Sequence, residues 1–69
     1  MSKPEIKQAI IQFLNDNFPK DFNIQEIADN TKVHRNTIST YVKVLVAEGR
    51  IRLTRTMGKI NLYSSSKET

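Results

Sequence analysis

Apolar residues recur at steps of three and four in three stretches of the chain, with polar residues between them. This spacing places the apolar side chains on one face of a helix. It predicts helices over residues 4–17, 24–30 and 35–48. The inward residues of these helices form the expected core, together with one residue between the second and third helices, Val33. The expected core is Ile6, Ile10, Phe13, Leu14, Ile27, Ala28, Val33, Ile38, Val42 and Leu45.

Local signals mark two helix boundaries. Asn23 and Glu26 have the spacing of a capping box, in which the side chain of each residue accepts a hydrogen bond from the backbone N–H of the other. Gly49 follows the third helical stretch, where a left-handed glycine often terminates a helix. The second and third helices therefore have defined beginnings and ends in the sequence itself.

After Gly49 the apolar period changes from helical to two. Ile51 and Leu53 alternate with polar residues, and a second alternating stretch covers residues 60–63. Gly58 lies between them, which predicts a β-hairpin with its turn at residues 56–59. A lone two-stranded hairpin is marginal in water. We therefore expect its apolar residues, Ile51, Leu53, Ile60 and Leu62, to lie against the helices.

These elements predict a fold that is mainly α with a small β-hairpin, in the order helix, helix, helix, hairpin. The length of 69 residues and the mass of 8.0 kDa are those of one small domain. We assign it to residues 1–63. Residues 64–69 carry no apolar anchor and are predicted to be a flexible tail or the start of a linker.

Composition argues against several classes of function. The chain has no cysteine and one histidine, His34, so neither a disulfide nor a metal site is expected. It lacks a nucleophile beside a base and a glycine-rich phosphate loop, so we expect no enzyme and no cofactor. The longest apolar run, residues 44–47, is too short to span a membrane. With no secretory leader in view, a cytoplasmic location is expected.

The net charge of +4 is unevenly distributed along the chain. Residues 1–31 hold three lysines against five acidic residues, whereas residues 32–63 hold seven lysines and arginines against Glu48 alone. A balanced solvated surface does not usually separate the signs in this way. The second half is therefore expected to face a polyanion.

The segment IQEIADNTKVHRNTISTYVKVLVAEGRI, residues 24–51, has the pattern of two steeply crossing helices joined by a short turn. Here the sequence resembles the winged helix-turn-helix domains of prokaryotic transcription regulators, particularly the MarR-, ArsR- and biotin-repressor-like groups. With the hairpin as the wing, the resemblance covers residues 4–63. It implies a transcription regulator that binds double-stranded DNA and associates with the nucleoid when bound. Such regulators usually dimerise on palindromic sites. The sequence leaves three states open: a monomer, a homodimer through the first helix, or the N-terminal domain of a longer protein.

A helical projection of residues 35–48 with Ile38 inward places a polar, acid-free face outward, suited to the major groove of DNA. Arg35 is a candidate for reading guanine, Asn36 for reading adenine and Lys43 for contacting phosphate. By resemblance, basic residues near the wing tip touch the DNA backbone or enter the minor groove. The predicted DNA-binding residues are Lys32, His34, Arg35, Asn36, Thr37, Ser39, Thr40, Lys43, Arg55 and Lys59.

Two of these residues depart from the family pattern. Lys32 stands where glycine is frequent and would be strained if its φ is positive. His34 stands where a serine or threonine commonly caps the next helix, and it would cap more weakly. Arg50 and Arg52 lie nearer the base of the wing, where they could pair with Glu48 or with the acidic first half.

Two alternatives remain open on the sequence. Winged helices also serve as protein-interaction modules in nucleic-acid-processing complexes, which would call for an exposed apolar patch, here around Ile11, Val44 and Val46. The same fold can also bind RNA. Binding to DNA through about five phosphates predicts that log affinity falls against log salt with a slope of roughly −4 to −5.

Overall fold

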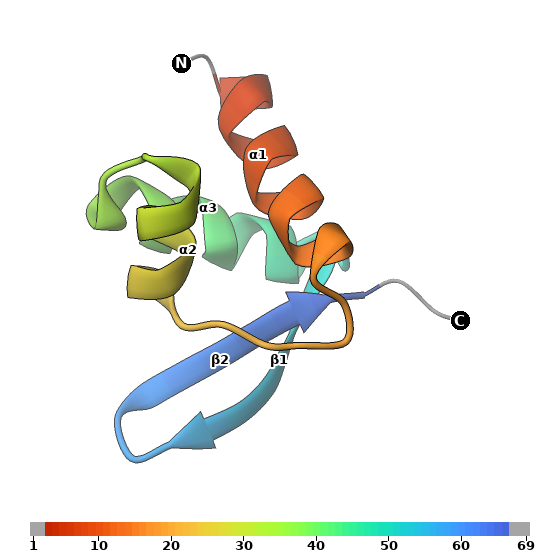
Figure 1. Cartoon of the computed structure of the whole chain (residues 1–69), viewed down its shortest axis with the longest axis vertical. Helices are drawn as coiled ribbons and strands as arrows, with labels where there is room; N and C mark the ends of the chain where they lie inside the picture. The colour runs from red at the N-terminus through yellow and green to blue at the C-terminus, as the bar shows by residue number, and fades with distance from the viewer. Residues whose placement is uncertain (1–2, 67–69) are drawn as a thin grey trace.

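Three helices lie above a β-hairpin in the computed structural model, which describes residues 3–66 (Figure 1). The hairpin extends away from the helices, with its tip at the far end from α1. This architecture confirms the predicted fold class. The elements are α1 Lys3–Asp16, α2 Ile24–Thr31, α3 Arg35–Ala47, β1 Ile51–Met57 and β2 Ile60–Ser65.

The predicted helix boundaries agree with the structure to within one residue. At the start of α2, the backbone N–H of Glu26 donates to Asn23 Oδ1 at 2.8 Å, and the N–H of Asn23 donates to Glu26 Oε1 at 3.0 Å. The capping box is therefore complete. Gly49 has a φ of 75°, the left-handed conformation expected after α3.

The core lies where the three helices meet the base of the hairpin. Ile10, Leu14, Ile27, Ile38 and Leu45 are fully buried. Phe13 and Val33, two further predicted core residues, are half-buried and pack against this cluster. Tyr63 is also buried, although the sequence analysis did not place it in the core.

The hairpin packs on the helices only at its base, so the prediction that all four of its apolar residues are buried is wrong for two of them. Ile51 and Leu62 are buried, but Leu53 is 46% exposed and Ile60 is 51% exposed. The pairing shifts between Leu53 and Arg55, forming a bulge that interrupts the alternation on β1. Beyond the bulge the hairpin extends past the helices.

The loop between α1 and α2 joins the hairpin as a third, single-residue strand. The N–H of Phe22 donates to the carbonyl of Tyr63 at 2.8 Å, and the N–H of Tyr63 donates back to the carbonyl of Phe22 at 2.8 Å. The rings of Phe22 and Phe13 lie 4.7 Å apart, which ties this loop to α1. The base of the wing is therefore hydrogen-bonded along both edges of β2.

The prediction of a flexible segment from residue 64 is wrong for Ser64 and Ser65, which belong to β2 and are buried. The hydroxyl of Ser64 donates to the carbonyl of Lys20 at 3.0 Å, and the hydroxyl of Ser65 donates to Asn15 Oδ1. Ser66 Oγ donates to the carbonyl of Arg50 at 2.8 Å. These serines anchor the strand by hydrogen bonds instead of apolar contacts. The rest of the predicted tail, residues 67–69, lies outside the described residues.

Within residues 3–66, none of the helices has the length and apolar character needed to cross a membrane.

Candidate nucleic-acid interface

The turn between α2 and α3 depends on an unusual backbone conformation at Lys32. This residue has a φ of 62° and a ψ of 31°, and its N–H donates to the carbonyl of Ala28 as it caps α2. The N–H of Val33 donates to the same carbonyl at 3.3 Å. A left-handed residue with a Cβ is strained, so Lys32 has the strain foreseen for a positive φ. Its side chain is exposed.

His34 is the N-cap of α3. Its Nδ1 accepts a hydrogen bond from the backbone N–H of Asn36 at 3.1 Å. The carbonyl of His34 accepts from the N–H of Ile38 at 3.0 Å, which begins the helical ladder. The capping role considered for His34 is therefore present, and the residue is exposed at the N-terminus of α3.

The outward face of α3 carries the polar residues that the helical projection placed there. Asn36, Thr40 and Lys43 are exposed, as is Arg35 at the first turn. Thr37 and Ser39 are half-buried at the two margins. The hydroxyl of Thr40 donates to the carbonyl of Asn36 at 3.2 Å, so its remaining capacity toward a ligand is as an acceptor.

A hollow of about 290 Å³ lies between α3, the wing and the start of α2. Arg35, Ser39 and Lys43 line it from α3, and Lys59 lines it from the hairpin turn. Four of the predicted site residues are therefore brought together from two separate elements. The lining residues, all within 3–66, include no acid: Asn23, Ile24, Gln25, Arg35, Ser39, Lys43, Lys59, Ile60, Asn61 and Tyr63.

Gln25 and Asn61 belong to this hollow but were not predicted as site residues. Gln25 is in the first turn of α2, and its Nε2 donates to Asp29 Oδ1 at 2.8 Å. Asn61 is on β2, and its Oδ1 accepts from the hydroxyl of Thr56 at 2.9 Å. The polar character of Gln25 at a helix N-terminus was the available signal in the sequence. For Asn61 the signal was its closeness to Lys59 in the predicted hairpin.

Thr37 and Thr40 also border a second groove, between α3 and α1. The predicted α3 residues are thus divided between two hollows, with Asn36 lining neither. The hollow beside the wing contains the cations Arg35, Lys43 and Lys59. It is therefore the better candidate for contact with a polyanion.

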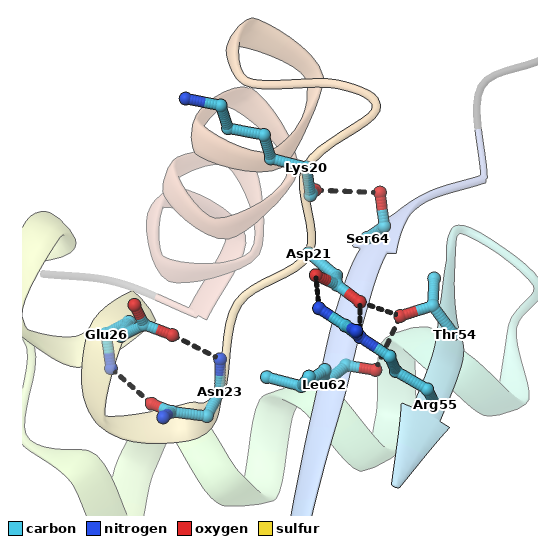
Figure 2. Close-up of polar contacts among 8 residues, drawn as sticks. All are labelled: Lys20, Asp21, Asn23, Glu26, Thr54, Arg55, Leu62 and Ser64. Carbon is cyan, nitrogen blue, oxygen red and sulfur yellow. Dashed lines mark hydrogen bonds and ion pairs between the residues drawn. The ribbon is translucent and has the colours of Figure 1, made fainter. Parts of the chain in front are cut away.

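Arg55 differs from Lys59 in having an internal partner. Its Nε lies 2.9 Å from Asp21 Oδ2, and its Nη2 lies 3.3 Å from Asp21 Oδ1 (Figure 2). Hydrogen bonds from Thr54 and Arg55 lower the pKa of Asp21 below its ordinary value of 3.8. A charge balanced in this way is less available to phosphate than a free cation. The partner, Asp21, was counted in the sequence only as part of the acidic half.

The suggested pairings of Arg50 and Arg52 are not the ones observed. Glu48 pairs with Lys7 of α1, with Nζ and Oε2 3.2 Å apart. The ion pair to the acidic half comes from Arg55, two residues beyond the bulge start at Leu53. Both Arg50 and Arg52 are exposed, and in the part of the chain that the structure describes neither forms an ion pair.

Comparison with known proteins agrees with this geometry. A family model described as an HTH domain matches residues 7–63, which include most of α1, all of α2 and α3, and most of the hairpin. The comparison with curated proteins returned no match. The matched family is one of DNA-binding domains and not of enzymes. With a helix-turn-helix followed by a wing, and a basic hollow between the two, the chain belongs to the HTH-domain family, a winged helix-turn-helix family that binds DNA.

Proposed function

We propose that the domain acts in transcriptional regulation in the cytoplasm, binding duplex DNA on the nucleoid. In this proposal α3 enters the major groove, and the wing rests on the neighbouring backbone or in the minor groove. The observation that carries the proposal is the hollow in which Arg35 and Lys43 of α3 and Lys59 of the wing face a common space.

The dimensions and charge of this surface suit duplex DNA. A helix with its side chains is 10–12 Å across, and the major groove is about 12 Å wide. No acidic residue among 3–66 lines the hollow, so phosphates can approach without repulsion. Residues of α3 and of the wing line the same hollow, which supports contact of both elements with one duplex.

Individual roles follow from side-chain chemistry. Arg35 can form a bidentate contact with guanine, and Asn36 can form one with adenine. Lys43 and Lys59 are assigned to phosphates, because an ammonium is a point charge without the planar geometry of base readout. Ser39 and Thr40 can contact either bases or phosphates. The exposed Lys32 and His34, together with Thr37, lie near the start of α3 and are assigned supporting contacts to the backbone.

A salt titration tests the proposal. Fluorescence anisotropy of a labelled random-sequence duplex, measured from 50 to 200 mM salt, should give a log–log slope of roughly −4 to −5 if about five phosphates are neutralised. Lys43→Ala or Lys59→Ala should each flatten the slope by about 0.9. A slope near zero for the wild-type protein would overturn the proposal.

Lys20→Ala is the matched control, because it removes one lysine away from the hollow. Lys20 lies in the loop after α1, and its side chain points away from the hairpin (Figure 2). It does not line the hollow. If Lys20→Ala flattens the slope as much as Lys43→Ala, the effect reflects net charge and not the assigned surface.

Sequence readout has its own test. Selection of bound duplexes from a random pool should yield a preferred site, and Arg35→Ala should relax the preference at one base pair. Loss of one bidentate contact corresponds to about 1–3 kcal/mol. Loss of affinity that is equal for every duplex would reassign Arg35 to the backbone.

Two further parts of the proposal are checked with the same material. An RNA duplex should bind more weakly than DNA of the same sequence, because its deep, narrow major groove does not admit a helix. A homodimer on a palindromic site would place two copies of α3 about 34–36 Å apart. Light scattering on and off the selected site measures that stoichiometry.

A further inference from the structure

A further hollow on the described part of the protein lies in the groove between α1 and α3. Its volume is about 760 Å³, and its walls include Ile11 from α1 together with Tyr41 and Val44 from α3. Val44 is 37% exposed, while Ile11 and Tyr41 are half-buried against the core. Two of these residues, Ile11 and Val44, belong to the apolar patch that the sequence suggested for protein contacts.

Each wall of the groove is a helical stripe two turns long. On α1 the stripe runs from Pro4 to Ile11, and on α3 it runs from Thr37 to Val44. Residues at i, i+3 or i+4 and i+7 lie on one helix face and span about 10 Å. Two such ridges side by side form the kind of groove into which a third helix packs with its own i, i+3/i+4, i+7 residues.

The charge on the rim of the groove indicates which kind of partner it favours. Lys7 and Arg50 line the groove, and none of its lining residues within 3–66 is acidic. Lys7 already forms an exposed ion pair with Glu48, whereas the guanidinium of Arg50 makes no ion pair within the described residues. The rim therefore favours an anionic partner.

The apolar floor of the groove favours a protein partner over DNA, because hydrated phosphates gain nothing from contact with Ile11 or Val44. A second copy of the chain in a two-fold arrangement would bring two cationic grooves face to face, with Arg50 near its own counterpart. Neither occupant matches both the floor and the rim. An amphipathic helix with acidic flanks matches both.

We propose that the groove between α1 and α3 docks an acidic amphipathic helix of a protein partner. Its apolar residues contact Ile11, Tyr41 and Val44, and its carboxylates face Lys7 and Arg50. The groove contains none of the cations Arg35, Lys43 and Lys59 assigned to DNA, and it shares only Thr37 and Thr40 with the proposed DNA surface. The inference does not rest on the DNA-binding proposal.

The probe for this surface is a fluorescein-labelled helical peptide with leucine at i, i+4 and i+7 and glutamate on the flanks. Fluorescence anisotropy at low salt should detect binding to the wild-type protein. Val44→Glu should weaken binding about tenfold or more, the effect expected from losing one buried anchor. Val46→Glu is the matched control, because Val46 is 36% exposed on the same helix but does not line the groove.

A second pair of variants tests the charged rim without touching the apolar floor. Arg50→Glu should weaken peptide binding, whereas Arg52→Glu, at an exposed position outside the groove, should not. Circular dichroism checks that all four variants remain folded. A duplex titration of Val44→Glu, run in parallel, separates failure of this proposal from failure of DNA binding.

Three results would overturn the proposal. The first is no binding of the glutamate peptide to the wild-type protein. The second is equal binding of a peptide in which lysine replaces every glutamate. The third is self-association of the chain that Val44→Glu abolishes, which would assign the groove to a second copy.

Discussion

The carboxylate of Asp21 and the guanidinium of Arg55 form a two-point ion pair that joins the loop after α1 to the wing. The two bonds measure 2.9 and 3.3 Å, and the hydroxyl of Thr54 adds a third at 2.7 Å to Asp21 Oδ2 (Figure 2). The side chain of Asp21 is 18% exposed, while that of Arg55 is 61% exposed. The acid is thus held in place while the base remains open to solvent.

The lowered pKa of Asp21 makes part of the stability depend on pH. Because its folded-state pKa is below the ordinary value of 3.8, the contribution is fully present above that value and is lost as the pH falls through the folded-state pKa. Asp21→Asn should therefore be less stable than wild type at pH 7, and the difference should shrink as the pH falls from 3.8 through the lower folded-state pKa. Thermal unfolding between pH 7 and pH 2 measures this difference. A constant difference across the range would contradict the prediction.

Arg55 should contribute less to DNA affinity than Lys59, because Asp21 already balances its charge. Arg55→Ala should flatten the salt slope by less than half of the 0.9 expected for a full phosphate contact. Asp21→Asn should steepen the slope, and it should do so only while Arg55 is present. A double-mutant cycle measures this coupling. If Arg55→Ala alone costs the full 0.9, the arginine leaves Asp21 when DNA binds.

Replacing Lys32 by glycine should stabilise the domain. The left-handed conformation of Lys32 costs about 1–2 kcal/mol for a residue with a Cβ, and part of the gain is offset by the greater freedom of glycine in the unfolded chain. A net gain of about 1 kcal/mol corresponds to a rise in Tm of roughly 4–8 °C for a domain of this size. Lys32→Ala, which removes the same charge but keeps the Cβ, should show no such gain.

The hairpin offers a matched pair of isoleucines at its two ends. Ile51 is 2% exposed at the base and Ile60 is 51% exposed near the tip. Ile51→Ala should cost about 2–5 kcal/mol, the range for a buried isoleucine, and Ile60→Ala should stay within about 0.5 kcal/mol. Chemical denaturation compares them. Equal losses would mean that the tip of the wing packs on the helices in solution.

The helices and their ends were predictable because their signals are local. The capping box of Asn23 and Glu26 spans three residues, and the stripe through Ile38, Val42 and Leu45 needs only the period of one helix. Gly49 ends α3 as expected because a positive φ is strongly tied to glycine. The order of elements then implied the fold.

The parts that sequence reasoning missed depend on residues far apart in the chain. Asp21 and Arg55 are 34 positions apart, and nothing in the local pattern pairs them. Alternation predicted burial of Leu53 and Ile60, but the length of hairpin that the helices cover is set by tertiary packing. Ser64 and Ser65 are buried through hydrogen bonds to the loop after α1 and to α1 itself, which an apolar pattern does not reveal.

The candidate site was predictable in chemistry but not in grouping. A helical projection identifies which side chains of α3 point outward, and four predicted residues do line the hollow beside the wing. The projection does not show which of these side chains line the same hollow, because that depends on the positions of α1 and the hairpin. Thr37 and Thr40 line a different groove, the one between α3 and α1.

The backbone bridge between Phe22 and Tyr63 has a mechanical consequence. It hydrogen-bonds β2 on the edge opposite β1 and so restrains the base of the hairpin against the loop after α1. The angle between α3 and the base of the hairpin is then set when the domain folds, before DNA binds. Less conformational entropy of the wing base is then lost on association.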